Sequence, residues 1–124
     1  MRAIDLARRN IELIDQTVRF ALDAGFHVVC EGILFTGHYG EMLRTICGEH
    51  VGSTHVYYFD VPFEETVRRH ATRAWAAEVS PKQMRDWFGA DDRLGVPGEI
   101  VIPATSSLAD TIESILFTAL PESP

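Results

Sequence analysis

Apolar residues recur at the spacing of an amphipathic helix in four stretches of this chain. The first stretch predicts a helix that begins with Asn10 as its N-cap and stops at Gly25. The second predicts a helix that ends near Gly48. The interior faces of the four helices are predicted to carry Ile11, Ile14, Val18, Ala21 and Leu22; Tyr39, Met42, Leu43, Ile46 and Cys47; Phe63, Val67, His70, Ala71 and Ala74; and Leu108, Ile112, Ile115 and Ala119.

Two capping boxes mark further helix starts. The stretch Ser80-Pro81-Lys82-Gln83 has proline at the first helical position, which predicts a short helix that runs to about Phe88. Ser107, with Asp110 three residues later, opens the last helix.

Three short runs between these helices are apolar throughout: HVVC (27–30), HVYYF (55–59) and EIVI (99–102). Such runs are typical of strands that are buried on both faces. Because helical stretches separate them, the connections are crossovers and the strands are predicted to be parallel. The sequence therefore predicts one α/β domain over residues 1–124, with a parallel sheet covered on both faces.

Composition limits the function classes. The chain has 124 residues, 46% hydrophobic and 23% charged, as expected for a single globular domain. Its net charge of −7 argues against nucleic-acid binding. The first ten residues have no apolar core of a signal peptide, and no apolar run approaches the ~20 residues that span a bilayer. Cys30 and Cys47 stand at apolar positions and are interpreted as small buried thiols, so we expect a cytoplasmic protein without disulfides.

Ligands of open parallel sheets bind outside the carboxyl ends of the strands. The residues at those ends are Glu31-Gly32, Asp60 and Pro103 to Ser106. At the end of a buried strand, Glu31 could hold a metal-bound water or accept a proton from a hydroxyl, and Gly32 would let a ligand approach the backbone. Alternatively, Glu31 caps backbone amides or pairs with an arginine. Asp60 either holds the following turn or contacts the site.

The third predicted helix carries a cluster of arginines. Arg69 and Arg73 lie one turn apart, so their guanidinium groups can grip neighbouring phosphate oxygens. The alternative is a set of surface ion pairs four residues apart, Glu64 with Arg68 and Glu65 with Arg69. That alternative leaves Arg73 without a helical partner.

Other chemistries find no support in the sequence. The five histidines and two cysteines lack metal-ligand spacing, so no zinc site is expected. Neither a nucleophile elbow nor a dinucleotide-binding glycine fingerprint is present, which argues against a hydrolase. Trp75 and Trp87 bracket a polar segment and are interpreted as packing for a mobile flap.

The order of these pieces resembles the small-molecule kinases of the P-loop superfamily, and is most similar to the bacterial kinases grouped with zeta toxin and chloramphenicol phosphotransferase. The resemblance covers residues 10–118. HVVCEGIL looks like the third strand of these kinases, FDVPFEETVRRHATR like the fourth strand and the helix into the lid, and MRDWFGADDRLG like the far side of the lid. EIVIPATSSLADTIESIL looks like the last strand, the adenine-side loop and the final helix.

The resemblance implies a parallel three-layer α/β/α sheet, with ATP and Mg²⁺ as cofactors and a lid at about residues 74–96. It makes Glu31 the strand-tip carboxylate, Arg69 and Arg73 the lid arginines, and Thr105 and Ser106 part of the adenine-side loop. Nucleotide kinases have an arginine close after the strand-tip pair, where this chain has Ile33-Leu34-Phe35. That difference favours a small hydroxyl-bearing acceptor, bound near Gly32, His38 and Tyr39.

One part of the family pattern does not occur in the sequence. There is no G-x-x-x-x-G-K-[ST] motif, and the one lysine, Lys82, lies in the lid. We therefore expect an incomplete sheet, with the phosphate loop and the first two strands upstream of Met1, and a polypeptide that is inactive alone. The alternative is a truncated, non-catalytic relative that binds a partner protein or a nucleotide. The open edge of the sheet also predicts a homodimer or aggregation.

Overall fold

The computed structural model describes residues 3–71, 80, 82, 83, 85 and 91–120. Contacts between Cα atoms divide the chain into two compact units, residues 1–54 and residues 55–124, and each is described separately. The chain is mixed α/β with a parallel pair of strands, so the predicted class is confirmed at this level. None of the described helices is long and apolar enough to cross a membrane.

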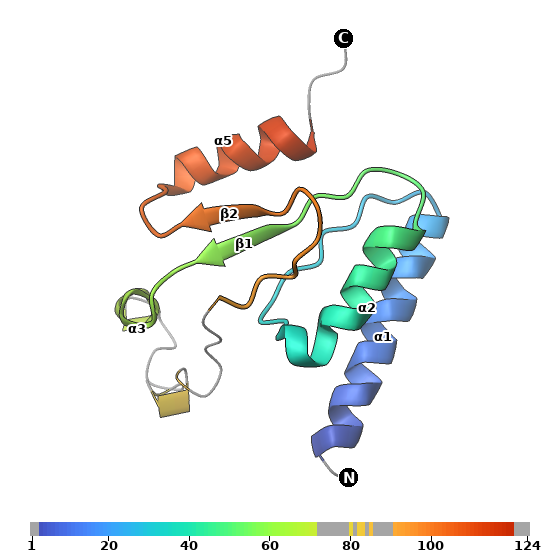
Figure 1. The fold of residues 1–124 in the computed structure, drawn as a ribbon, viewed down its shortest axis with the longest axis horizontal. Coiled ribbons are helices and arrows are strands. Elements are labelled where there is room, and N and C mark those ends of the chain that lie inside the picture. Colours follow the sequence, from blue (N-terminus) through green and yellow to red (C-terminus); the bar gives the residue numbers. More distant parts are fainter. Residues whose placement is uncertain (1–2, 72–79, 81, 84, 86–90, 121–124) are drawn as a thin grey trace. The chain divides into compact units, whose positions relative to one another are not determined.

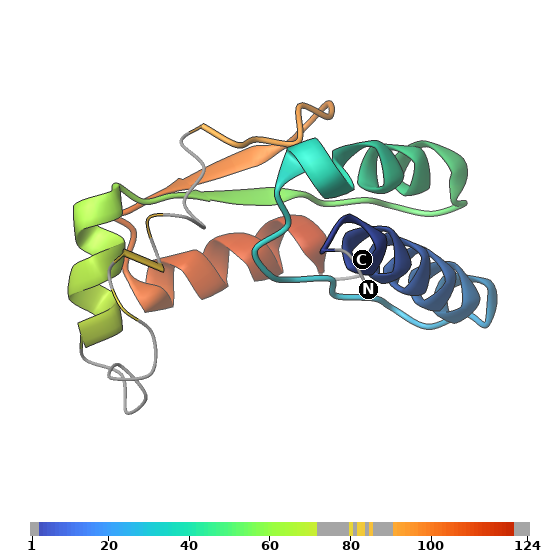
Figure 2. The same ribbon diagram turned by 90° about the horizontal axis from the view of Figure 1, so that it is seen from below.

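The first unit contains two helices, α1 (Ala3–Asp23) and α2 (Thr36–Glu49). They lie side by side and run in the same direction, and the segment between them returns along their length (Figures 1 and 2). A salt bridge of 2.8 Å from Arg19 to Glu49 joins their carboxyl ends. The predicted interior faces of both helices are confirmed, because all ten residues that the sequence analysis placed on them are half-buried or buried.

The predicted start of α1 is wrong, and its predicted end is correct. The helix continues upstream through Asn10 to Ala3, so the predicted N-cap is wrong; residues 3–9, AIDLARR, contain strong helix formers. Gly25 does stop the helix, as predicted. It has a φ of 88°, and the amides of Gly25 and Phe26 donate to the carbonyls of Leu22 and Ala21.

Residues 27–30 do not form the predicted strand. They follow α1 as extended backbone without ladder hydrogen bonds, and 89% of Val29 is exposed. A strand exists only when a neighbour supplies its hydrogen bonds, and the apolar run alone does not provide one. Cys30 is exposed rather than buried, and Cys47 is half-buried.

The second unit is built on the parallel strands β1 (Tyr57–Asp60) and β2 (Ile100–Pro103), which confirms the second and third predicted strands. Tyr57 pairs with Ile100, and Asp60 with Pro103. Helix α3 (Phe63–Ala71) stands across the carboxyl end of the strands, while α5 (Leu108–Ala119) runs back along them (Figures 1 and 2). Tyr57 in β1 and Thr118 in α5 are joined by a hydrogen bond between their hydroxyl groups.

The capping box at Ser80 has both of its hydrogen bonds, and Ser107 is the N-cap of the last helix. The Ser80 hydroxyl accepts from the Gln83 amide at 3.2 Å, and the Gln83 side chain accepts from the Ser80 amide at 2.8 Å. The Ser107 hydroxyl accepts from the Asp110 amide at 3.0 Å and begins α5. The remainder of the predicted 80–88 helix, together with Trp75 and Trp87, falls largely outside the described residues.

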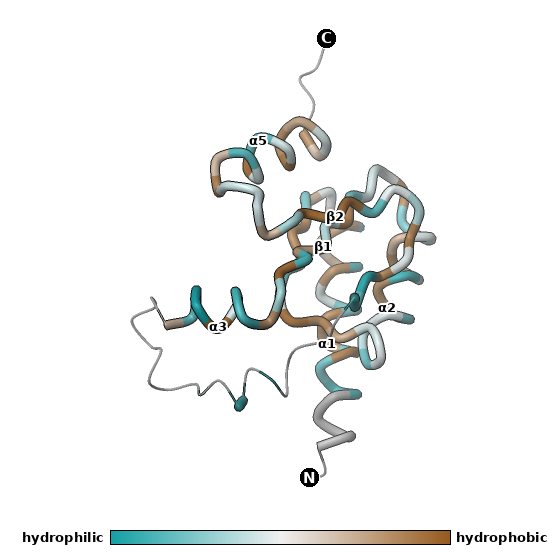
Figure 3. Tube along the Cα trace, turned by 60° about the vertical axis from the view of Figure 1, so that its left-hand side comes forward, coloured by the Kyte–Doolittle hydropathy of each residue, from teal (hydrophilic) through white to brown (hydrophobic). Residues whose placement is uncertain are grey.

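Burial is much lower than predicted. Among the described residues, three apolar side chains are buried, Ile46, Leu94 and Ile102. The strands are partly exposed rather than covered on both faces. Hydrophobic segments lie along α5 as well as along the strands (Figure 3), and the predicted interior residues Leu108 and Ile112 are exposed. The further exposed apolar side chains of α5 are Leu116 and Phe117, followed by Leu120 after its end.

Candidate functional site

The carboxyl ends of β1 and β2 meet at one edge of the sheet, because Asp60 and Pro103 are register partners. Helix α3 starts from this edge after Val61 and Pro62, and the Pro62 carbonyl accepts from the amides of Glu65 and Thr66. The turn at 104–107 leaves the same edge and leads into α5. The residues that the sequence placed at the ends of these two strands therefore lie together.

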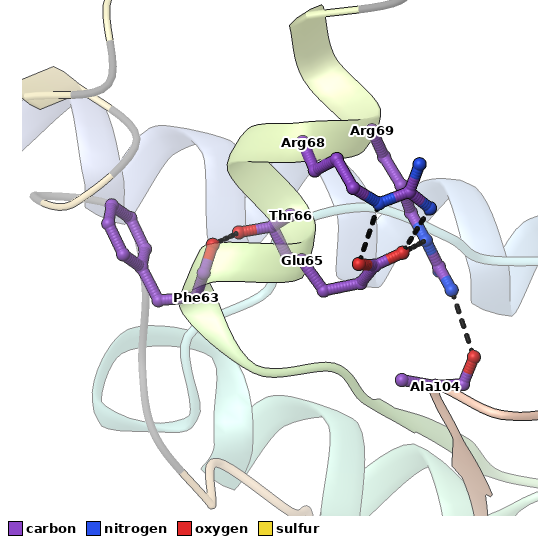
Figure 4. Close-up of polar contacts among 6 residues, drawn as sticks. All are labelled: Phe63, Glu65, Thr66, Arg68, Arg69 and Ala104. Atoms are coloured by element: carbon purple, nitrogen blue, oxygen red, sulfur yellow. Dashed lines mark hydrogen bonds and ion pairs between the residues drawn. The ribbon is translucent and has the colours of Figure 1, made fainter.

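Two arginines of α3 converge on one carboxylate (Figure 4). Arg68 donates from Nε to Glu65 Oε2 at 2.8 Å and from Nη2 to Oε1 at 2.5 Å. Arg69 donates from Nε to the same Oε1 at 3.0 Å. The predicted pair of Glu65 with Arg69 is confirmed, whereas Arg68 pairs with Glu65 three residues away instead of with Glu64.

The electrostatics of this cluster follow from its hydrogen bonds. Those from Arg68, and then those from Arg69, lower the pKa of Glu65 from 4.5 to about 2. The hydrogen bonds to Glu65, and then the charge of Glu65, raise the pKa of Arg68 in return. At neutral pH, two guanidinium groups therefore donate to one carboxylate, on a chain whose net charge is −7.

Arg69 also connects two elements of the second unit. Its Nη2 donates to the carbonyl of Ala104 at 3.0 Å, across 35 positions of sequence (Figure 4). Ala104 is the first residue after β2, so this bond ties α3 to the turn at 104–107. The lid arginine and the adenine-side turn of the predicted site are therefore in direct contact.

Thr105 and Ser106 lie in that turn. The Ser106 amide donates to the Pro103 carbonyl at 3.0 Å, and its hydroxyl is 2.8 Å from that of Thr111, a buried residue of α5. Ser106 is thus held from both sides, whereas Thr105 is exposed. The turn consequently presents Thr105 to solvent next to Arg69.

The structure adds two arginines that the sequence analysis did not assign. The guanidinium carbon of Arg85 lies 3.8 Å from the centroid of the Phe63 ring, at the start of α3. Arg93 donates from Nε to Asp91 at 2.8 Å, and this hydrogen bond, followed by the charge of Asp91, raises the pKa of Arg93; the charges of Glu99 and Asp60 add to the effect. Both belong to the predicted lid. Arg85 is distant in sequence from Phe63, so no local pattern predicts that contact, whereas Arg93 pairs with an acid two residues away.

The other predicted site residues belong to the first unit. Glu31 is exposed, and Gly32 beside it has a φ of 149°, which favours glycine. His38 and Tyr39 lie in the first turn of α2, with ring centroids 6.5 Å apart. Because residues 27–30 are not a strand, Glu31 does not stand at a strand end. Arg73 lies outside the described residues.

In the described part of the chain, no three His, Cys, Asp or Glu side chains are grouped closely enough to hold a metal ion. Comparisons with protein-family models, with curated proteins and with solved structures find no match to this chain. The resemblance to P-loop kinases therefore stays a prediction.

Proposed function

We propose that the chain is the C-terminal portion of an ATP-dependent small-molecule kinase, which transfers the γ-phosphoryl group to a hydroxyl acceptor. The observation that carries this proposal is the position of Arg69. Its guanidinium group lies at the carboxyl edge of a parallel strand pair and bonds to the turn that follows β2. Phosphoryl transfer depends mainly on positioning and on cations beside the phosphate, and this edge supplies such a cation.

Arg69 and Arg73 would neutralise charge on the transferred phosphoryl group in this proposal. Planar guanidinium groups suit phosphate oxygens because they donate two parallel hydrogen bonds. Thr105 and Ser106 would border the adenine side. The direct bond from Arg69 to Ala104 supports this division, because it brings the phosphate-side cation and the adenine-side turn within one hydrogen bond of each other.

Glu31 would orient a water on Mg²⁺ or accept the proton of the acceptor hydroxyl, with Gly32, His38 and Tyr39 beside the acceptor. When bound, ATP supplies the phosphoryl group, and Mg²⁺ neutralises part of its charge. Magnesium in kinase sites is held by one or two carboxylates together with the phosphates, so the exposed Glu31 is a suitable ligand type. The glycine-rich loop that cradles the phosphates does not occur in these 124 residues.

Two experiments test the kinase proposal. The DNA upstream of the Met1 codon should encode, in frame, a glycine-rich loop that ends in Lys-Ser or Lys-Thr. In the longer protein, Arg69→Ala and Arg73→Ala should each reduce turnover at least about tenfold while changing ATP affinity less, because these cations act on charge that develops during transfer. An in-frame stop codon without such a loop, or unchanged turnover in both variants, would contradict the proposal.

The exposed apolar surface of α5 favours a second candidate, a non-catalytic module that binds a partner protein. Leu108, Ile112 and Leu116 are 78%, 48% and 49% exposed and follow one another at four-residue spacing, so they lie along one face of the helix. Under this candidate, the chain would bind a partner through α5 and would show no phosphoryl transfer. Absence of transfer in the longer protein, combined with a partner that protects α5 amides from exchange, would favour it over the kinase.

A further inference from the structure

The arginine cluster of α3 differs from an ordinary row of surface ion pairs. The sequence offers each arginine its own acid four residues earlier, Glu64 for Arg68 and Glu65 for Arg69. In the structure, both arginines bond to Glu65. One carboxylate therefore accepts hydrogen bonds from two neighbouring guanidinium groups.

The shared carboxylate has the geometry of a bound oxyanion. One oxygen accepts from Nε of Arg68, while the other accepts from Nη2 of Arg68 and from Nε of Arg69, at distances between 2.5 and 3.0 Å. A phosphate group offers the same pair of acceptor oxygens, a third oxygen, and a larger negative charge. The third oxygen can take the Nη2 donor of Arg69, which here bonds to the carbonyl of Ala104.

We propose that Arg68 and Arg69 form an oxyanion site in which the Glu65 carboxylate is the resident counter-anion, displaced when a phosphate group binds. Glu65 then has two effects. It keeps both guanidinium groups in place beside the sheet edge before the ligand arrives, and it weakens ligand binding because it competes for the same donors. The identity of the physiological ligand, a transferred phosphoryl group, rests on the kinase function proposed above.

Displacement of the Glu65 carboxylate should also affect the turn after β2. When Arg69 transfers its Nη2 donor to a phosphate oxygen, the Ala104 carbonyl loses its bond from α3. The turn at 104–107 carries Thr105 and Ser106 and begins α5 through the Ser107 cap. Phosphate binding on α3 should therefore change the surroundings of the amides at 105 and 106.

The test is a titration of the 124-residue chain with inorganic phosphate at pH 7, followed by NMR of the arginine Nε–H and backbone amide groups. Glu65→Gln keeps the shape of the side chain and removes its charge, while Glu64→Gln removes the same charge from an exposed neighbour on α3. Since exposed charge pairs are individually weak, we expect Glu65→Gln to bind phosphate about fivefold more tightly than Glu64→Gln does. The double variant Glu65→Gln/Arg69→Ala should lose this gain.

A second test uses the wild-type protein and therefore does not depend on how any substitution affects folding. Saturating phosphate should shift the Nε–H signals of both arginines and the amide signals of Thr105 and Ser106. Equal phosphate affinity in Glu65→Gln and Glu64→Gln, or an unmoved Arg69 signal in the wild type, would overturn the inference.

The result separates this inference from the kinase proposal. Tighter phosphate binding by Glu65→Gln, with no effect of Arg69→Ala or of Arg73→Ala on transfer from ATP, supports the oxyanion site and contradicts the kinase. Loss of transfer in Arg69→Ala, with no gain of phosphate affinity in Glu65→Gln, contradicts Glu65 as a resident anion and leaves the kinase proposal standing.

Discussion

Ile102 offers the sharpest test of the fold, because it is one of three buried apolar residues in the part of the chain that the structure describes, and its neighbour Val101 is not buried. Ile102 is 5% exposed, whereas Val101, on the opposite face of β2, is 41% exposed. Side chains of a strand alternate between faces, so the two residues report on different sides of the same strand. Truncating each of them should therefore give different losses in the free energy of unfolding.

Truncation of a buried isoleucine to alanine costs about 2–5 kcal/mol, and to valine about 0.5–1.5 kcal/mol. In the described part of the second unit, one other apolar side chain, Leu94, is buried. A core with few buried members can relax into the space that truncation leaves, so we expect the lower part of the range, about 2–3 kcal/mol for Ile102→Ala. Val101→Ala should cost less than about 1 kcal/mol, because much of that side chain is already in water.

Urea unfolding followed by far-UV circular dichroism, at low micromolar protein concentration, measures both losses. Wild type, Ile102→Val, Ile102→Ala and Val101→Ala are compared through their midpoints and m-values. The order of stability should be wild type, then Val101→Ala and Ile102→Val close together, then Ile102→Ala. If Val101→Ala destabilises the protein as much as Ile102→Ala, the wrong face of β2 has been assigned to the interior, since a one-residue slip exchanges the two faces.

Three further predictions concern the cap, the arginine cluster and self-association. Ser107→Ala should lower the free energy of unfolding by about 1 kcal/mol, because the α5 cap to the Asp110 amide is lost, while Ser107→Asp should restore it in the same urea assay. The depressed pKa of Glu65 means that its stabilising pairs are fully present above pH 4.5 and are lost only as the pH falls through about 2. The arginine Nε–H signals should accordingly stay constant from pH 7 to pH 5 and move mainly below pH 4; movement centred on pH 4.5 would contradict the shared carboxylate. The 124-residue chain should self-associate in sedimentation experiments, and Phe117→Ser should reduce this, whereas a compact monomer with one cooperative transition above about 55 °C would contradict it.

The helix faces could be predicted from the sequence because their cause is local. On α1 and α2, apolar residues three and four positions apart fall on one side of any helix, whatever it packs against. The stop at Gly25 and the cap at Ser107 are equally local, since their hydrogen bonds span only a few residues. Local rules also locate the ends of β1 and β2 to within one or two residues of the predicted positions.

The strand predicted at residues 27–30 and the burial of α5 could not be obtained in the same way. Strand formation depends on a neighbour that may be distant in sequence, and an apolar run such as HVVC records only a tendency to be buried. Similarly, the periodicity of α5 predicts which face of the helix is apolar. It does not predict whether another element covers that face. Leu108 and Ile112 have interior character in the sequence and are exposed in the structure.

The arginine cluster could be predicted from the sequence only in part. Periodicity predicts that Glu65 can reach Arg69, and the structure confirms this pair. Periodicity does not decide whether Arg68 turns to Glu64 or to Glu65, because side chains three and four residues apart are both within reach on a helix. The bond from Arg69 to Ala104 depends on how β2 pairs with β1, and no local rule contains that information.

This undetermined choice has a functional consequence. If Arg68 paired with Glu64, each cation of α3 would be compensated by its own acid, and a phosphate would have to compete with two carboxylates. With both arginines on Glu65, a phosphate that displaced this carboxylate would gain both guanidinium groups. An acidic chain repels anions at long range, so an anion site on it must be strong locally. In the oxyanion site proposed above, two adjacent guanidinium groups that already converge on Glu65 beside the carboxyl edge of the strand pair would provide that local strength.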